Sequence, residues 1–165
     1  MSRVVLGLGT NIGERVQNLQ FAVDALRLVP DVRVTAVSPI YETAPVGFLD
    51  QPDFLNAVVL LETALSPQTV LGLCLGIEAA AGRVRKMRNG PRVLDIDVLL
   101  YEGAYSDSAE LTLPHPRMTQ RGFVLVPLLD LFPSGEALGL SFSGFLQTMD
   151  TSDVRKTSYI LHWEE

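Results

Sequence analysis

GPRVLDIDVLL, residues 90–100, is a largely apolar stretch that carries two aspartates two positions apart. In a β-strand, residues i and i+2 share a face about 6.6 Å apart, so Asp95 and Asp97 would lie on one face and the apolar residues around them on the other. The apolar face predicts burial against a core. Aspartate is poorly suited to strands, and like charges at this spacing repel each other. The acidic face is therefore either a solvated outer face or a site that binds cations.

The segment just before this strand favours the cation site. RVRKMRNGPR, residues 83–92, holds five of the 13 Lys and Arg residues of the chain and no acidic residue. A nucleotide polyphosphate with bound Mg²⁺ requires such a combination, because carboxylates and phosphate oxygens bind the hard cation while guanidinium groups neutralise the remaining phosphate charge. A solvated basic loop would explain the arginines but not their position beside the two aspartates.

Apolar periodicity on either side of this region predicts an α+β fold. Strands are expected over residues 3–8, 32–41, 54–62 and 92–101, and helices from 16 to 30 and from 66 to about 82. The second helix is marked by Ser66 as N-cap and Pro67 at its first position. This β-α-β-β-α-β order is that of a ferredoxin-like core, in which helices pack on a mainly antiparallel sheet.

The rest of the chain predicts C-terminal additions to that core. We expect a short strand over 111–113, helices over 123–131 and 143–149, and a strand-like segment over 157–161. The chain has 165 residues, of which 47% are apolar, so it can bury one substantial core. We therefore expect a single domain over residues 1–165.

Composition and charge exclude several classes of protein. The net charge of −6 argues against binding to a nucleic-acid backbone. The first residues form a strand-like run rather than a leader, and no apolar stretch approaches about 18 residues, so a membrane span or export is not expected. The single cysteine, Cys74, lies in an apolar helical pattern and reads as a core residue of a protein in a reducing compartment. A cytoplasmic monomer is the expectation.

GLGTNIG, residues 7–13, invites comparison with a dinucleotide-binding motif but differs from it. The spacing is G-x-G-x-x-x-G, one residue too long, and no acidic residue ends the second strand. We interpret it as a tight turn in which Asn11 braces neighbouring backbone. A G-x-x-x-x-G-K-[ST] loop is also missing, so a bound nucleotide would have to be held by side chains and metal.

Two further groups of residues could contribute to a binding site. Phe54 and Asn56 share a strand face, and an aromatic ring beside an amide could hold a flat heterocycle, although a core phenylalanine is the commoner role. His115, Arg117 and Arg121 form a second basic cluster, for which an ordinary solvated turn is about equally favoured.

Four separated segments carry a resemblance to a known family. They are LGLGTNIGERVQNL (6–19), YETAPVGFLDQPDFLNAVVLLET (41–63), GRVRKMRNGPRVLDIDVLLY (82–101) and LTLPHPRMTQRGFVLVPLLDL (111–131). The sequence resembles the 6-hydroxymethyl-7,8-dihydropterin pyrophosphokinases of folate biosynthesis from about residue 3 to residue 133. Some members carry tryptophan in the basic loop where this chain has Asn89, and the loop looks one residue shorter here.

The resemblance implies an Mg²⁺-dependent enzyme that transfers the β,γ-pyrophosphoryl group of ATP to the pterin hydroxymethyl group and leaves AMP. It implies that Asp95 and Asp97 ligate two Mg²⁺ ions, and that Arg83 and Arg92 act on the phosphates during transfer. ATP, as co-substrate, would be bound by Glu78, Arg85, Val98, Thr112, His115 and Arg121. The pterin would be bound by Thr43, Val46, Phe54, Asn56 and Phe123, the two phenylalanines stacking on opposite faces of the ring.

Two other classes of function share parts of this pattern. A ferredoxin-like regulatory module could bind a nucleotide or metabolite without chemistry, but mere binding rarely needs two metal-ligating carboxylates on one strand. An RNA-recognition sheet has the same element order, but it needs exposed aromatic residues on its central strands and a basic surface. The segments VVLGLG and RVLDIDVLL have neither.

Overall fold

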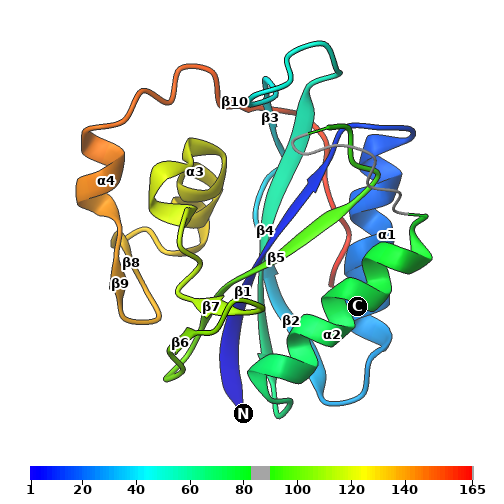
Figure 1. Ribbon diagram of the computed structural model, residues 1–165, viewed down its shortest axis with the longest axis vertical. Helices are drawn as coiled ribbons and strands as arrows, with labels where there is room; N and C mark the ends of the chain where they lie inside the picture. The colour runs from blue at the N-terminus through cyan, green and yellow to red at the C-terminus, as the bar shows by residue number, and fades with distance from the viewer. Residues whose placement is uncertain (83–89, 165) are drawn as a thin grey trace.

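The computed structural model describes residues 1–82 and 90–164 and is built on an antiparallel sheet in the strand order β10-β3-β4-β1-β5, with β2 also pairing with β4 (Figure 1). The strands are β1 (Ser2–Thr10), β2 (Val32–Val37), β3 (Tyr41–Thr43), β4 (Phe54–Thr63), β5 (Asp95–Tyr101) and β10 (Arg155–Lys156). Strands β1, β2 and β3 each pair with β4 in antiparallel orientation. The expected β-α-β-β-α-β core is confirmed.

Helices lie on both sides of this sheet. On one side α1 (Arg15–Leu28) and α2 (Pro67–Ala80) run across the strands, and on the other α3 (Gly122–Leu131) packs against β4 (Figure 1). Beyond α3 lie α4 (Ser143–Gln147) and the hairpin of β8 (Glu136–Ala137) and β9 (Leu140–Ser141). A second hairpin joins β6 (Ser106–Asp107) to β7 (Thr112–Leu113), followed by a 3-10 turn, Met118–Gln120. In the described ranges, each helix is too short or too polar to cross a membrane.

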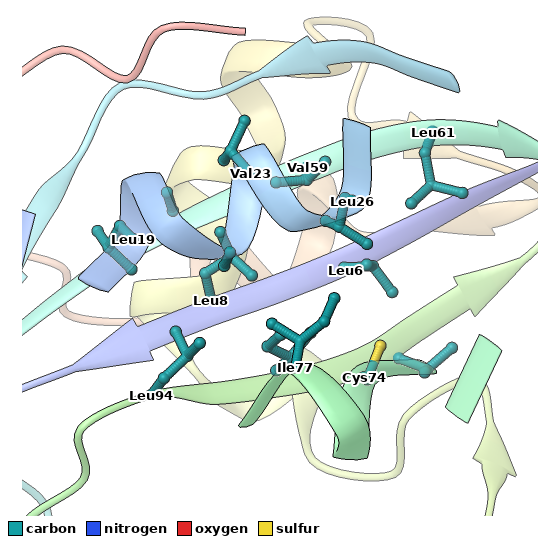
Figure 2. Packing of buried hydrophobic residues seen from close by; sticks show 14 of the residues in the cluster. Leu6, Leu8, Leu19, Val23, Leu26, Val59, Leu61, Cys74, Ile77 and Leu94 are labelled. Carbon is teal, nitrogen blue, oxygen red and sulfur yellow. The ribbon is translucent and has the colours of Figure 1, made fainter. Parts of the chain in front are cut away.

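The main core lies between the sheet and α1 and α2 (Figure 2). Leu6 and Leu8 of β1 point into it and contact side chains from both helices, including Leu19 and Leu26 of α1. Cys74 of α2 is fully buried there, and burial raises the pKa of its thiol to about 12. A buried thiol of raised pKa is a poor nucleophile, which confirms the expectation that Cys74 is a packing residue.

The expected second strand is interrupted and forms two strands. β2 pairs with the far end of β4, and β3 pairs with its beginning, where Tyr41 lies opposite Asn56. Between them, Pro39 has no N–H to donate to the ladder, so the strand cannot continue through it. Ser38 instead exchanges hydrogen bonds with Val58, through its own N–H and its hydroxyl. The interruption therefore places β2 and β3 at opposite ends of β4.

Two further expectations about strands differ from the structure. β5 begins at Asp95 rather than at residue 92, because the N–H and C=O of Arg92 bond to Asn11 instead of continuing the ladder. The expected strand over 157–161 is wrong. The chain pairs with β3 only through β10, because β3 is three residues long, and it then leaves the sheet to pass along α1, where His162 and Gln20 exchange hydrogen bonds.

The other expected elements are present with small shifts in their ends. Ser66 caps α2 by accepting a hydrogen bond from Thr69 N at 3.2 Å, and Pro67 is the first helical residue, as predicted. α3 and α4 lie where short helices were expected, over Gly122–Leu131 and Ser143–Gln147. The short strand expected over 111–113 is β7, Thr112–Leu113.

One side-chain contact ties the sheet edge to α3 and leads to a prediction. Tyr41 of β3 donates its hydroxyl to Asp130 Oδ2 of α3 at 2.6 Å, and burial together with this carboxylate holds the pKa of Tyr41 above its ordinary value. Tyr41→Phe should lower the free energy of unfolding by about 1.5–3 kcal/mol, because a hydrogen bond to a charged group is lost. Urea unfolding measures this.

Tyr159→Phe is the matched control, because Tyr159 is largely exposed and its hydroxyl has no hydrogen-bond partner among the residues described. Its unfolding free energy should stay within about 0.5 kcal/mol of the parent protein. Equal stabilities for the two variants would contradict the role assigned to Tyr41.

Candidate active site

The sheet face that α1 and α2 do not cover differs in packing between its two ends. At one end Val5 of β1, Val58 of β4 and Leu99 of β5 are buried in a second core beneath α3. Further along β1, the positions on that face are Gly7 and Gly9, which have no side chain to fill the space above the strand. The same face is therefore a packed core at one end and a hollow at the other.

Strand register sets polar groups on both sides of these glycines. On β5, Asp97 lies opposite Gly7 and Asp95 opposite Gly9, whereas on β4 Asn56 lies opposite Gly9. Neighbouring strands are about 4.8 Å apart, so the carboxylates and the amide are separated by roughly 10 Å across a floor of bare backbone. An elongated ligand can lie on this floor and reach both ends.

A cavity of about 540 Å³ occupies the hollow, a size typical of small-molecule sites. Its walls come from β1, β3, β4, β5, the start of α3 and the segment that follows α4. Nine of the residues that the family resemblance implicates in binding or catalysis line this cavity: Thr43, Val46, Phe54, Asn56, Arg92, Asp95, Asp97, Arg121 and Phe123. The fold thus brings together residues that are up to 80 positions apart in the chain.

The two aspartates project from β5 towards the cavity beside guanidinium groups. Asp95 Oδ2 lies 3.4 Å from Arg92 Nε, and Asp97 Oδ2 lies 3.7 Å from Arg121 Nη1. The aspartate side chains are 30% and 46% exposed, while Ile96 between them is buried in the main core. The prediction that the two carboxylates share one face and that the apolar residues are buried is confirmed.

Both arginines are held in place by further contacts. Arg92 is 8% exposed at its side chain and donates from Nη1 to the carbonyl oxygen of Gly90 at 2.6 Å. The Arg121 guanidinium lies 5.5 Å from the centroid of the Phe123 ring, a cation–π geometry. Burial lowers the pKa of Arg121, and the charge of Asp97 opposes that shift. Positive charge is thereby kept beside the carboxylates within a partly closed site.

The other end of the floor is built around the Asn56 amide. Asn56 is buried on β4 and donates from Nδ2 to Thr43 Oγ1 of β3 at 2.9 Å. A Cβ atom at Gly9 would lie 3.3 Å from Asn56 Oδ1, so a larger residue there would crowd the amide and require it to shift by a few tenths of an ångström. Phe54 lies on β4 two residues before Asn56, and Phe123 enters the cavity from α3. Phe54 therefore brings aromatic surface beside the amide at this end, whereas the Phe123 ring lies next to Arg121.

Asn11 braces two distant segments, which differs from the expected contact with neighbouring backbone. Its Nδ2 donates to Gln51 Oε1 and to the carbonyl oxygen of Pro52, both at 2.9 Å, and its Oδ1 accepts from Arg92 N at 2.7 Å. Asn11 is fully buried. The loop before Phe54 and the segment before Asp95 are thus joined through one side chain.

Glu78 supports the acidic strand from behind. Its side chain is buried on α2, and Oε2 accepts a hydrogen bond from Ile96 N at 2.8 Å. Ile96 lies between the two aspartates on β5, the edge strand of the sheet order. The carboxylate of Glu78 therefore holds the backbone that carries both aspartates.

Several other residues implicated in binding lie outside the cavity wall. Val98 packs in the main core, so a ligand could meet only its backbone. Thr112 on β7 donates to the carbonyl oxygen of Ser108. His115 accepts from Arg117 N at Nδ1, and burial lowers its pKa against the opposing charge of Asp97. Arg83, Arg85 and Asn89 lie outside the described residues.

Sequence reasoning from the residues alone missed three features of the site. Phe123 came only from the family resemblance, since nothing in the sequence places α3 above β4. The side-chain contacts of Asn11 and Glu78 link segments far apart in the chain, which no local pattern reveals. Two sequence signals could have marked these side chains as buried and hydrogen-bonded. Asn11 is an amide in a glycine-rich turn, and Glu78 is a lone carboxylate in an apolar helix.

Comparisons with known proteins find related sequences. Residues 5–133 match the family described as 7,8-dihydro-6-hydroxymethylpterin-pyrophosphokinase (HPPK). A 2-amino-4-hydroxy-6-hydroxymethyldihydropteridine pyrophosphokinase of Methylorubrum extorquens is 47% identical over 94% of this chain and 99% of its own length. The enzyme of the same name from Pseudomonas aeruginosa is 44% identical over 81% of this chain and 82% of its own.

A solved structure shows a similar fold. It is the wild-type HPPK-DHPS of Plasmodium falciparum with pterin and p-hydroxybenzoate, with a TM-score of 0.67 and 16% identity. The match covers 89% of this chain and 43% of that longer chain. At this identity the likeness concerns the fold alone.

The bracing role of Asn11 can be tested by substitution. Asn11→Ala removes the three side-chain hydrogen bonds and leaves the buried Arg92 N–H without its partner, so it should lower the free energy of unfolding by about 2–3 kcal/mol. Amide hydrogen exchange around Gln51 and Arg92 should become faster. Urea unfolding and exchange followed by mass spectrometry measure the two effects.

Asn18→Ala serves as the control. Asn18 Nδ2 bonds within the adjacent turn, to Thr10 Oγ1 and the Ile12 carbonyl oxygen, so its loss should leave exchange at the two distant segments unchanged. If both variants exchanged alike at Gln51 and Arg92, Asn11 would not be the link between them.

Proposed function

The chain belongs to the 7,8-dihydro-6-hydroxymethylpterin-pyrophosphokinase family, and we propose that the cavity over Gly7 and Gly9 is where its two substrates meet. The protein transfers the pyrophosphoryl group of ATP to the hydroxymethyl group of 6-hydroxymethyl-7,8-dihydropterin, a step of folate biosynthesis. Because the β- and γ-phosphoryl groups leave together, the products are AMP and the pterin diphosphate.

The assignment of the site rests on one observation: the two ends of the cavity floor, which Gly7 and Gly9 form, carry different chemical groups. Carboxylates and guanidinium groups occupy the β5 end, and an amide with Phe54 as its aromatic neighbour occupies the β4 end. We infer that the phosphates lie over Asp95 and Asp97 and that the pterin lies beside Asn56. The hydroxymethyl group would then face the β-phosphorus between the two ends.

Asp95 and Asp97 are the residues that would hold Mg²⁺. Among the described residues no group of three acidic, histidine or cysteine side chains surrounds a common point. Two carboxylates on one face suit Mg²⁺, which binds proteins through one or two carboxylates and takes its other ligands from phosphate oxygens and water. Two such ions, when bound, would screen phosphate charge and acidify the attacking hydroxyl.

Arg92 and Arg121 are placed to bind phosphate. Each lies beside an aspartate at 3.4–3.7 Å, longer than a tight ion pair, so a metal-bound phosphate can take the place of the carboxylate as partner. Guanidinium groups there would stabilise charge that develops during in-line attack. The corresponding phosphate roles of Arg83 and Arg85 stay predictions.

The pterin would be recognised by polar groups from β3 and β4 and held by aromatic rings. We propose that Asn56 and the backbone at Thr43 and Val46 bond the ring edge. Phe54 and Phe123 would stack on it, since flat heterocycles bind well against aromatic side chains. Such positioning supplies much of the rate when a phosphoryl acceptor must lie in line with its donor.

Other residues proposed to bind the nucleotide lie outside the cavity wall. We propose that His115 and Thr112 lie near the nucleotide and that Val98 contacts it through its backbone. Glu78 would act through Ile96 N by positioning the aspartates, rather than by touching ATP. A monomeric state and a cytoplasmic location stay predictions.

The product pattern tests the proposed chemistry. Incubation with ATP, Mg²⁺ and 6-hydroxymethyl-7,8-dihydropterin should yield AMP and the pterin diphosphate in equal amounts, resolved by ion-exchange chromatography. Omission of either the pterin or Mg²⁺ should abolish AMP formation. ADP as the nucleotide product would instead mean ordinary kinase chemistry, and tight ATP binding without turnover would indicate a regulatory module.

The metal role of Asp97 leads to a further prediction. Asp97→Ala should lower kcat by at least about 10³-fold, the scale seen when a charge-stabilising group is removed from an active site. The variant should remain folded, since the Asp97 side chain is 46% exposed. Calorimetry should also show weaker Mg²⁺ binding in the presence of a non-hydrolysable ATP analogue.

Asp107→Ala is the control, because Asp107 is exposed on β6 in another sheet. Its kcat and Mg²⁺ affinity should match the parent protein. Retention of a tenth or more of the activity by Asp97→Ala would refute the metal role.

A further inference from the structure

The segment that follows α4 reaches the substrate cavity. Residues 149–156, here called the C-terminal strap, lie beyond the part of the chain that matches the family, residues 5–133. Four strap residues line the cavity together with Phe54 and Asn56: Met149, Asp150, Asp153 and Val154. In Figure 1 the chain passes from α4 over one end of the sheet to β10, beside β3. One wall of the site is thus supplied by residues that follow residue 133.

The strap packs directly on the start of α3. A Cβ atom built at Gly122 would lie 3.3 Å from Val154 Cγ2 and 3.5 Å from Met149 Sδ. Gly122 immediately precedes Phe123, the aromatic residue that α3 contributes to the cavity. Val154 and Met149 therefore set how closely the strap approaches the residue next to Phe123.

At its other end the strap is tied to β3 and β4. Arg155 Nη2 lies 2.8 Å from Asp53 Oδ2, and Asp53 directly precedes Phe54. In the β10–β3 ladder, Arg155 lies opposite Glu42, the residue before Thr43. Just past the strap, Thr157 donates from both its N–H and its hydroxyl to the carbonyl oxygen of Ile40.

These contacts connect the three elements that carry the residues assigned to the pterin. α3 holds Phe123, β3 holds Thr43, and β4 holds Phe54. The strap contacts Gly122, Asp53 and Glu42, and each of these is adjacent in sequence to one of those residues. Its position therefore sets the distance between the two phenylalanines and the residues proposed to bond the edge of the pterin ring.

Charge on the strap indicates which substrate lies beside it. Asp150 and Asp153 are exposed carboxylates at the cavity. They would repel a polyphosphate, because like charges placed together across an interface are unfavourable. A neutral heterocycle meets no such penalty and gains apolar contact with Met149 and Val154.

We propose that the C-terminal strap is the outer wall of the pterin subsite, and that Val154 and Arg155 are positioning residues that set its width. This inference rests on the proposed function, since it assigns the wall to one of the two substrates. Val154 acts by packing on Gly122, and Arg155 acts by holding the strap against Asp53. Binding of ATP at the β5 end does not depend on the strap.

Single substitutions in the strap test the proposal with two separate ligands. Arg155→Ala should weaken binding of 6-hydroxymethylpterin, followed by its fluorescence, about tenfold, and should raise the pterin KM about as much. Val154→Ala should act in the same direction. For both variants kcat and the affinity for a non-hydrolysable ATP analogue with Mg²⁺ should stay within about twofold of the parent protein.

Lys156→Ala is the matched control, since it removes a neighbouring exposed positive charge on the same strand. Its pterin affinity should be unchanged, whereas Arg155→Lys should recover part of the affinity lost in Arg155→Ala. Arg155 is 55% exposed at its side chain, so its loss should leave the fold intact, as circular dichroism would verify.

Three outcomes would overturn the proposal. Pterin affinity within about twofold of the parent protein in both Arg155→Ala and Val154→Ala would show that the strap does not define the subsite. Equal losses for pterin and for the ATP analogue would mean that the strap supports the fold as a whole. Failure of the unaltered protein to bind any pterin would instead overturn the proposed function, and with it the assignment of this wall.

Discussion

The absence of side chains at two positions of β1 is the constraint on which the site depends. Gly7 and Gly9 face the side of the sheet that α3 covers elsewhere, and they interrupt the core that begins at Val5. A Cβ atom at Gly7 would lie 3.2 Å from Leu99 Cδ1, and one at Gly9 would lie 3.3 Å from Asn56 Oδ1. Larger residues would fill the hollow and displace the groups at its edges.

Polar contacts keep the hollow end of the sheet ordered where apolar packing is missing. Asn11 joins the loop before β4 to the segment before β5, Glu78 holds Ile96 N, and Asn56 bonds Thr43. These groups are buried and bonded, which favours one arrangement, because a buried polar group that loses its partner is costly. On the opposite face, α1 and α2 cover the sheet with apolar side chains (Figure 2), and Glu78 of α2 bonds to β5 from that side.

Carboxylates and guanidinium groups at the site balance each other's charge through contacts long enough for other charged partners to replace them. The Arg92–Asp95 and Arg121–Asp97 contacts are long, at 3.4 and 3.7 Å, and both carboxylates are partly exposed. They keep carboxylates and guanidinium groups side by side where we propose that cations and phosphates bind. The strap adds apolar side chains and two carboxylates to the other end, so the two ends of one cavity differ in their chemistry.

The amino-acid sequence alone determined the features that follow from local chain geometry. The period-2 pattern placed Asp95 and Asp97 on one face with Ile96 buried between them, and Ser66 with Pro67 marked the start of α2. Only the tertiary structure decided the partners of Asn11, the entry of Phe123 into the cavity, and the path of residues 157–161 away from the sheet. Strand alternation and helix capping act within a few residues. Contacts between distant segments depend on which surfaces meet when the chain folds, and no local pattern records that.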